Sequence, residues 1–579
     1  MKNRFHVICI VMLLLFSLQV LAKSNSNSAF NKYKTGFINR LWKLYPDWAT
    51  SVGYHQYDSV LNIPNANQRL KEKSFFSIER NALKQYSYEQ LSDANKIDYR
   101  ILEDYINYGI WQIDQYKSWQ WNPADYNVGS SFAYILLENY APLNKRLADF
   151  YIKMKNVPAY YEAAKQHIYQ PSEVHLKLAI DQNEGTLSIF ETDYVGAVKS
   201  LKLHPEMEKA YLQRGADASK AIQSYIQFLK NYNTENGRSF RLGKDLYADK
   251  FKYEIQSAYT SDEIYNAAIT RKDFLHTEMT QLAKLLWPRY FGKLEMPVNN
   301  LQLIKKVIDT ISVQHVKAVN FKAEIEKQIP ELTAFVKEKN LIYINPKKPL
   351  KVRKEPSYMA GVAGASISSP GPYERKGTTY YNVGTLDGWD SARAESYLRE
   401  YNQYTLQILN IHEAIPGHYV QLVYSNKSPS IIKSILGNGA MIEGWAVYSE
   451  LMMMENGYGL DQDSAAFWLM YYKWNLRTVC NTLLDIGVHT KNMSHAEAMD
   501  LLVNQAFQQQ AEAEGKWRRV QVTNVQLTSY FTGFYEILQL RNYLKEKDGA
   551  AFNVKKFNEN FLSYGSAPVN YIRELMLKK

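Results

Sequence analysis

Two histidines and a glutamate stand close together in residues 412–418, whose sequence is His-Glu-Ala-Ile-Pro-Gly-His. Imidazole nitrogens and carboxylate oxygens are common zinc ligands, and zinc peptidases use a neighbouring glutamate as general base. Their H-E-x-x-H motif places the histidines four residues apart, on one face of a helix. Here His418 follows His412 by six residues, which on a regular helix turns it about 120° away. Either the segment is no metal site, or the helix is distorted.

Pro416 and Gly417 offer a cause for such a distortion. A proline inside a helix lacks the N–H for its own hydrogen bond and crowds the carbonyl four residues back, here that of His412. Glycine adopts dihedral angles that are closed to other residues. We therefore expect the helix to kink or bulge between His412 and His418. If the distortion absorbs two extra residues, both rings reach one metal ion and Glu413 keeps its place beside the first ligand.

A catalytic zinc site needs a third protein ligand besides two histidines and a water. Glu443 lies in a helical pattern that follows the histidine pair after a loop-like stretch. A helix, a connection and a second helix would return Glu443 to the histidines, and its apolar neighbours favour this over a solvated carboxylate. Glu450 lies two turns further along the same helical face and is a candidate hydrogen-bond partner for a ligand.

Four polar residues recur at every fourth position in the next helical stretch, Asp463 to Thr490: Arg477, Asn481, Asp485 and His489. They form one polar ladder, and the apolar residues around it predict that it is buried. In one interpretation Arg477 binds a substrate carboxylate or a site glutamate, Asp485 orients a histidine or arginine, and His489 donates to an oxyanion. In the other, the ladder is a hydrogen-bond network that holds helices together.

Tyr530 lies on a long helical stretch near the C-terminus. It would supply a hydroxyl to the transition state, unless it is one more packed tyrosine among 45. His495 belongs to Ser494-His495-Ala496-Glu497, which fits a capping box and predicts a helix start instead of a ligand. The chain has no G-x-S-x-G elbow, Walker A pattern or G-x-G-x-x-G fingerprint between a strand and a helix. Metal-assisted hydrolysis is the chemistry that remains.

Helical patterns dominate the elements that would position these residues. They cover five N-terminal stretches: Phe30 to Trp48, Asn81 to Trp111, Ala141 to Ala164, Pro205 to Tyr232 and Ser261 to Leu286. Short β-prone runs, separated by proline and glycine, replace them between Asn340 and Trp389. These runs are Leu341 to Asn345, Tyr358 to Met359, Ser366 to Ser368 and Thr378 to Val383. Helix returns after Asp390, a plausible N-cap. We expect a mainly α fold with a small β-segment beside the metal-binding helix.

Residues 1–22 have the pattern of a secretory signal, with a basic start, an apolar run and small residues before a cleavage site. Cys9 lies inside the apolar run and not just after it, which is unlike a lipoprotein signal. We expect an exported protein, periplasmic or extracellular; a retained anchor is the alternative. Residues 23–339 would form a helical N-terminal part, continuous with a chemical part at 340–579 that holds the β-segment and C-terminal helices.

Composition excludes several classes of protein. The 579 residues are 46% hydrophobic, which supports a large packed core. Cys480 would be the only cysteine after signal removal, so we expect no internal disulfide. No later stretch offers 18 uncharged apolar residues, so no membrane span is expected after the signal. The formal charge of +11 is scattered without a basic block, so nucleic acid is not an expected partner.

Beyond the heptapeptide and the Tyr419-Val420-Gln421 that follows it, four segments stand out: Leu44 to Tyr57, Glu443-Gly444-Trp445-Ala446, Asp485-Ile486-Gly487-Val488-His489, and Gln526 to Arg541. Together these motifs resemble the bacterial family DUF885 over nearly the whole mature chain. The resemblance implies an all-helical, gluzincin-like zinc-peptidase architecture. In it, His412, His418 and Glu443 match the metal ligands, and Glu413 matches the general base. In one departure, Asn524-Val525 stands where the family usually has Pro-Gly before the last helix.

We therefore predict an exported, Zn²⁺-dependent hydrolase, most simply a metallopeptidase acting on short peptides with Glu413 as general base. An extended substrate would pair with a strand edge near Thr378 to Val383 or Gly361 to Ser368. Two alternatives stay open, namely hydrolysis of non-peptide amides or esters at the same site, and a non-catalytic helical binding protein. A set of two histidines and a glutamate also accepts divalent metals other than zinc. Nothing in these patterns specifies the oligomeric state.

Overall fold

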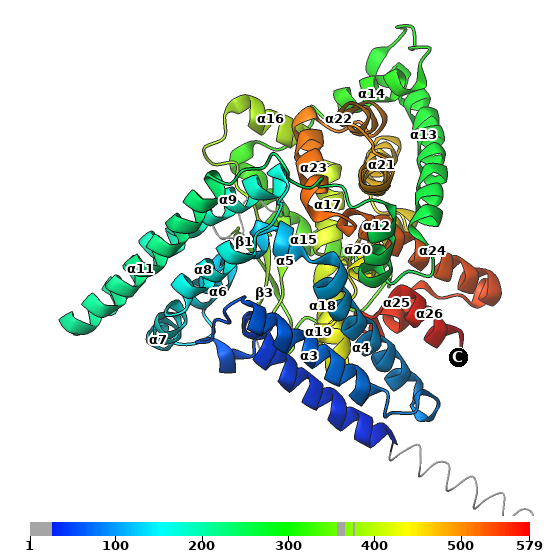
Figure 1. Ribbon diagram of the computed structural model, residues 1–579. Coiled ribbons are helices and arrows are strands. Elements are labelled where there is room, and N and C mark those ends of the chain that lie inside the picture. The colour runs from blue at the N-terminus through cyan, green and yellow to red at the C-terminus, as the bar shows by residue number, and fades with distance from the viewer. Residues whose placement is uncertain (1–25, 356–364, 375–376, 579) are drawn as a thin grey trace, which may run out of the picture. The chain divides into compact units, whose positions relative to one another are not determined.

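The computed structural model describes residues 26–355, 365–374 and 377–578, and shows a mainly α-helical protein with one small sheet (Figure 1). The signal segment and the run Tyr358 to Met359 lie outside the described residues. None of the described helices combines the length and the apolar character needed to cross a bilayer. The expectation of a mainly α fold with a small β-segment is confirmed.

Contacts along the chain separate two compact units. Unit 1 holds the residues up to Arg238 together with Pro429–Leu436, and unit 2 holds Ser239–Ser428 with Gly437–Lys579. The first boundary therefore falls well before residue 339, where the change in sequence texture suggested a division. All the candidate site residues belong to unit 2.

Unit 1 is built from helices. They are residues 26–44, α2 (Pro46–Ser51), α3 (Ala66–Leu83), α4 (Asp93–Trp111), α5 (Ser118–Trp121), α6 (Gly129–Leu137), α7 (Leu143–Met154), α8 (Val157–His167), α9 (Glu173–Ser188), α10 (Tyr194–Ser200), α11 (Pro205–Lys230) and α19 (Ile431–Ile435). Three stretches expected as single helices are each divided in two, and the first, Phe30 to Trp48, divides at Tyr45, where Pro46 begins α2. α4 starts anew because Ser92 caps it by accepting from the Asn95 N–H. α8 starts anew with Pro158 in its first turn, where the missing N–H costs nothing.

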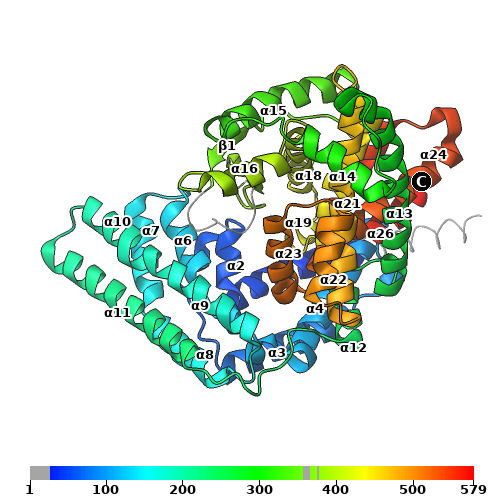
Figure 2. The same ribbon diagram turned by 90° about the horizontal axis from the view of Figure 1, so that it is seen from above.

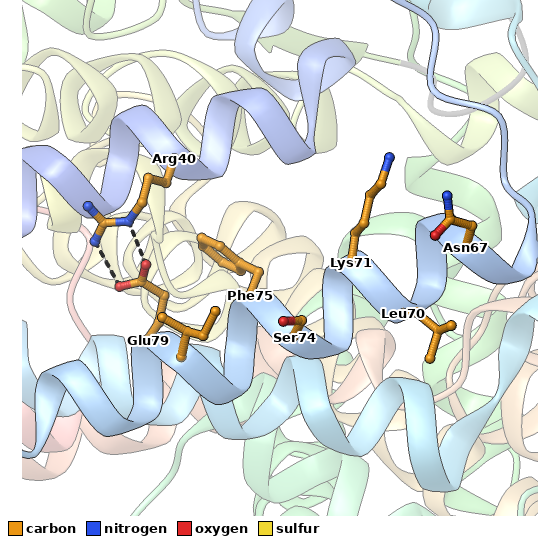
Figure 3. Close-up of a pocket in the computed structure, with 8 residues that line it drawn as sticks. Arg40, Asn67, Leu70, Lys71, Ser74, Phe75 and Glu79 are labelled. Atoms are coloured by element: carbon orange, nitrogen blue, oxygen red, sulfur yellow. Dashed lines mark hydrogen bonds and ion pairs between the residues drawn. The ribbon is translucent and has the colours of Figure 1, made fainter.

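A shallow surface groove on unit 1 runs along α3 (Figure 3). Its lining residues are Arg40, Asn67, Leu70, Lys71, Ser74, Phe75, Ile78 and Glu79. At one end Nε and Nη2 of Arg40 donate to the Glu79 carboxylate at 2.6 and 2.9 Å. The one carboxylate in the lining is thus already paired, and the lining contains no histidine or cysteine. The groove offers no hydrolytic chemistry.

The sheet belongs to unit 2 and has the order β1-β3-β2. β1 (Leu350–Lys354) pairs parallel to β3 (Thr379–Val383), and β2 (Ala365–Ser368) pairs antiparallel to it. Two expectations need correction. The run Leu341 to Asn345 forms no strand, and β1 lies after it instead. β3 is the central strand, so both of its edges are already hydrogen-bonded and no substrate peptide can add there.

The rest of unit 2 is helical (Figure 2). Its helices are α12 (Lys244–Ile255), α13 (Ser261–Phe291), α14 (Asn300–Ile311), α15 (Phe321–Glu338), α16 (Ser391–Glu400), α17 (Thr405–Glu413), α18 (His418–Ser425), α20 (Gly439–Glu455), α21 (Ser464–Thr490), α22 (His495–Met499), α23 (Gln510–Thr523), α24 (Ser529–Asp548), α25 (Val554–Ser563) and α26 (Val569–Leu577). Two predicted starts are confirmed: Asp390 caps α16, and the capping box at Ser494 begins α22. α21 is buried along most of its length and includes the free cysteine, Cys480.

α20 and α24 approach each other backbone to backbone (Figure 1). A Cβ on Gly444 would lie 2.2 Å from the Gly533 carbonyl carbon, and one on Gly533 would lie 1.7 Å from the Ala440 oxygen. No side chain fits at either position, so only glycine permits this crossing. Because Glu443 directly precedes Gly444, the crossing also sets the distance between Glu443 and α24.

Candidate metal centre

The helix that carries His412 stops inside the heptapeptide. α17 ends at Glu413 and α18 begins at His418, so the predicted deformation is present, as a full break and not as a bulge. The connection folds back on α17, because the Gly417 N–H donates to the Ile411 carbonyl at 2.9 Å. A Cβ on Gly417 would stand 1.8 Å from the His412 oxygen. Only glycine therefore allows the chain to turn this tightly.

The break brings His412 and His418 to the same side, facing Glu443 from α20. Glu443 Oε2 lies 3.3 Å from His418 Nε2 and 3.7 Å from His412 Nε2. The two imidazole rings are nearly perpendicular, at 88°, with centroids 4.8 Å apart. Solvent reaches this cluster, because the side chains of His418 and Glu443 are 12% and 21% exposed. The three residues that the sequence indicated as ligands thus converge.

The cluster fits a small divalent cation. Ligand atoms about 2.0–2.2 Å from a tetrahedral zinc lie roughly 3.3–3.5 Å from one another. The two separations that involve Glu443 are close to this range, and one ligand atom from each of the three residues lies within 4.8 Å of the others. Glu443 Oε2 is also buried without a hydrogen-bond partner among the described residues. A cation would satisfy that oxygen and draw the two imidazoles together around it.

Glu450 orients the first histidine. His412 Nδ1 lies 2.6 Å from Glu450 Oε1, and the same oxygen accepts from the Trp474 indole N–H at 3.0 Å. The Nδ1 hydrogen bond leaves His412 Nε2 as the nitrogen that faces Glu443 and His418. Glu450 therefore takes the supporting role that its position along α20 predicted.

The charges of the cluster support one another. Burial opposes ionisation of His412, yet its interactions with the carboxylates of Glu443 and Glu450 outweigh burial and raise the pKa of His412 to about 10. Burial also opposes ionisation of Glu443, but the imidazoles of His418 and His412 hold its pKa well below the usual range. The Glu443 carboxylate is thus kept ionised, and the His412 imidazole is kept protonated. A metal ion would replace that proton.

Glu413 is the last residue of α17 and is not part of the ligand triad. Burial raises the pKa of its carboxyl, while the two histidines act in the opposite direction. A carboxylate with a raised pKa beside a metal site is suited to accept a proton from water near neutral pH. Its role as general base stays a prediction.

Tyr530, in the first turn of α24, lies beside the triad. Its ring is 6.4 Å from the His412 ring, centroid to centroid, at an angle of 23°. Burial, followed by the negative charge of Glu443, raises the pKa of the Tyr530 hydroxyl, whereas interactions with Arg519 and Gln526 lower it. The hydroxyl is therefore a protonated donor at neutral pH.

Asp485 holds the entry to α24. Its carboxylate accepts the N–H groups of Val525 and Leu527 at 2.8 and 3.3 Å, and the Tyr247 hydroxyl at 2.6 Å. Val525 has φ of +72°, a conformation that favours glycine. The hydrogen bonds that Asp485 accepts stabilise this strained turn. Asp485 thus holds the turn that precedes Tyr530, and it does not orient a histidine of the centre.

His489 does not take the role predicted for it. Its Nε2 lies 2.8 Å from the Val520 carbonyl, and its Nδ1 accepts from the Leu242 N–H at 3.4 Å. Both ring nitrogens are therefore occupied by main-chain groups, and the side chain is buried. No nitrogen is left to donate to an oxyanion. The alternative interpretation, a hydrogen-bond network between helices, describes Asp485 and His489.

Arg477 is paired with a residue that the sequence analysis did not consider. Its Nη2 donates to Glu512 of α23, and its guanidinium lies over the Trp474 ring, 4.9 Å from the centroid. Lys516 and Arg519 follow Glu512 on the same face of α23, at helical spacing. That spacing was visible in the sequence, but nothing there placed α23 against α21.

Residues 46–576 match the model of a family described as "Bacterial protein of unknown function (DUF885)". A search of curated proteins gives no match. Among solved structures, a "putative lipoprotein of unknown function" from Shewanella oneidensis is 47% identical with a TM-score of 0.85, over 95% of this chain and 99% of that chain. A "putative lipoprotein" from Colwellia psychrerythraea has a TM-score of 0.76 at 15% identity, over 96% and 99% of the two chains. The second likeness concerns the fold alone.

Proposed function

We propose that this chain, which belongs to the DUF885 family of bacterial proteins of unknown function, is an exported zinc-dependent hydrolase that cleaves short peptides. One observation carries the proposal: His412, His418 and Glu443 converge, with Glu413 next to the first of them. This is the donor set of two imidazoles and a carboxylate that catalytic zinc sites use, with an acidic residue in the position of a general base.

When bound to the triad, zinc would supply a Lewis acid that polarises the scissile carbonyl and acidifies water. Glu413 takes the proton of the attacking water, for which its raised pKa is suited, and passes that proton to the leaving amine. Glu450 keeps His412 in the tautomer that presents Nε2 to the triad. The Tyr530 hydroxyl donates to the oxyanion that forms as water adds.

The surroundings of the triad favour small substrates. Glu443 and His418 keep 21% and 12% of their side-chain surface accessible, while His412 is buried. Of the two strand edges expected to pair with a substrate, that of β3 is closed because β3 is central, whereas β2 lies at the outside of the sheet. The limited access to the triad suits short peptides better than folded proteins.

Metal analysis and a substrate screen test the proposal together. Wild-type protein should contain about one zinc per chain and cleave members of a short-peptide library. Glu413→Gln should keep the metal and lose turnover, whereas His495→Gln, which changes a histidine of the α22 capping box, should match the wild type. Peptides, esters and non-peptide amides are assayed in parallel, so that the preferred bond is identified.

Two results would refute this function. One is a protein that holds no stoichiometric metal and keeps its fold and stability unchanged in chelator. The other is a Glu413→Gln variant that turns over substrate like the wild type. Export is tested separately, by mass spectrometry of the protein recovered from the cell envelope or medium, which should begin after Ala22.

A further inference from the structure

We propose that Arg477, Lys516 and Arg519 form a subsite that binds a carboxylate group of the substrate beside the metal centre. The inference rests on the proposed function and names the class of substrate: short peptides that bear a free carboxylate. The groups come from two adjacent helices of unit 2, Arg477 from α21 and the two others from α23.

The three cations lie in one connected cluster. Lys516 Nζ donates to Asn481 Oδ1 at 2.6 Å and lies 3.9 Å from Glu512 Oε1, the same oxygen to which Arg477 donates. Arg519 is one turn beyond Lys516 on the same face of α23, and its Nη2 donates to the Gln526 amide oxygen at 2.7 Å. Arg477, Glu512, Lys516 and Arg519 therefore form a continuous polar strip.

The strip carries more positive than negative charge. Three basic side chains, two of them guanidinium cations, face one carboxylate, that of Glu512, because the other partners, Asn481 and Gln526, are neutral. The nearby carboxylate of Glu400 is already paired with Lys473 at 2.8 Å, with both side chains only 4% exposed. An excess of buried positive charge is costly without a counter-ion. Burial and the charge of Arg477 accordingly lower the pKa of Lys516. A bound carboxylate would supply the missing charge.

Arg477 has hydrogen-bonding capacity left over. Its Nε is buried and has no partner among the described residues, although Nη2 is engaged by Glu512. The pair is still accessible, since the side chains of Arg477 and Glu512 are 20% and 30% exposed. A guanidinium presents its N–H groups as a planar fork that matches a carboxylate. Nε is therefore a donor that Glu512 does not use, and it belongs to a guanidinium that is partly exposed.

The strip meets the metal centre at two points. At one, the Trp474 ring under Arg477 donates its N–H to Glu450, which holds His412. At the other, Arg519 interacts with Tyr530, whose ring lies against that of His412. When the scissile carbonyl of a short peptide lies at the triad, a carboxylate a few residues along that peptide is thus placed to meet the strip. The carboxylate is either the chain terminus or an acidic side chain.

Binding of matched tripeptides tests this subsite apart from catalysis. Isothermal titration calorimetry with zinc-loaded Glu413→Gln compares acetyl-Ala-Ala-Ala as free acid and as amide, and acetyl-Ala-Glu-Ala amide with its Gln counterpart. We expect a carboxylate-bearing member to bind at least about tenfold more tightly than its neutral partner. Preference in the first pair identifies the terminal carboxylate, and preference in the second identifies the side chain.

Single substitutions then locate the subsite. Lys516→Met and Arg519→Gln should each reduce the carboxylate preference about tenfold, and Arg477→Lys should weaken it by losing the fork. The matched control is Arg518→Gln, which removes the same charge from the exposed face of α23. Circular dichroism and melting curves check the fold, and Arg519→Gln decides the outcome if Lys516→Met does not fold.

Failure of this inference is distinct from failure of the proposed hydrolysis. If neither pair shows a preference for its carboxylate-bearing member, or if Lys516→Met and Arg519→Gln behave like Arg518→Gln, the subsite is refuted even in an active enzyme. If the acid preference is present and depends on the strip but no peptide is ever cleaved, the subsite stands and the hydrolase function fails.

Discussion

Replacing Gly417 by alanine is the sharpest perturbation of the metal centre. The new Cβ would stand 1.8 Å from the His412 oxygen and 2.4 Å from the Ile411 oxygen. Real Cβ atoms essentially never come closer than 3.0 Å to such atoms, so the backbone must shift by more than 1 Å. Both oxygens belong to α17, and His418 directly follows the substituted residue. The shift therefore changes the spacing between the two histidines.

The size of the effect follows from what the site tolerates. Overpacking of a tight interior costs about 1–3 kcal/mol, and backbone strain adds to it, so we expect Gly417→Ala to lower the free energy of unfolding by about 2–4 kcal/mol. Metal–ligand distances are fixed to about 0.2 Å, so a displacement of this size should reduce zinc affinity by at least about 100-fold.

Gly439→Ala is the matched control. Gly439 begins α20 in the same unit, and a Cβ there would meet nothing within 4 Å. Alanine is the better helix former, so this variant should be as stable as the wild type or more stable by up to about 1 kcal/mol. Denaturant unfolding of the metal-free proteins and competition with a zinc indicator measure both quantities. If Gly417→Ala binds zinc and unfolds like Gly439→Ala, the broken-helix geometry is wrong.

Three further changes probe other parts of unit 2. Glu450→Gln removes the charge that holds His412 Nδ1 at 2.6 Å and should lower zinc affinity about 10–100-fold in indicator competition; unchanged affinity would deny it a supporting role. Tyr530→Phe should reduce kcat about 100-fold with KM little altered, and an equal loss in kcat and in metal content would point to a structural effect instead. Burial raises the pKa of Glu536 to about 7, against about 4.3 when unfolded. The folded state thus keeps a proton that the unfolded chain releases, so this contribution to stability is complete below about pH 4.3 and is lost as the pH rises to 7, by roughly 4 kcal/mol in total. Glu536→Gln should flatten that dependence in denaturant unfolding at pH 5.5 and 8, and a parallel pH dependence in both proteins would contradict the assignment.

The local sequence was sufficient where a short segment determines its own structure. The capping residues Asp390 and Ser494 begin helices as predicted, because an N-cap bonds only to residues of its own first turn. The distortion within residues 412–418 was predictable for the same reason, since proline and glycine act on the backbone next to them. Glu443 was identified by its position after the histidines on a helix with apolar neighbours.

Only the tertiary structure decided which polar residues meet. His489 and Tyr530 were both candidates for an oxyanion donor, but the partners of His489 are Leu242 and Val520, far away in sequence. The proposed role of Arg477 likewise depends on its contact with Glu512, and on Lys516 beside it, both on another helix. Such contacts depend on how helices pack, and helical periodicity specifies a buried face without specifying what covers it.

Residues 412–418 show both what the local sequence predicts and what only packing decides. Their residue types determined the candidate ligands, the candidate general base and the need for a distortion of the helix between His412 and His418. The form of that break depended on the Gly417 N–H reaching the Ile411 carbonyl, and the closure of the site depended on the glycine crossing that brings α24 against α20. The sequence gives the types of side chain and so the reactions that they can support. The distances between those side chains are determined by packing across the whole unit.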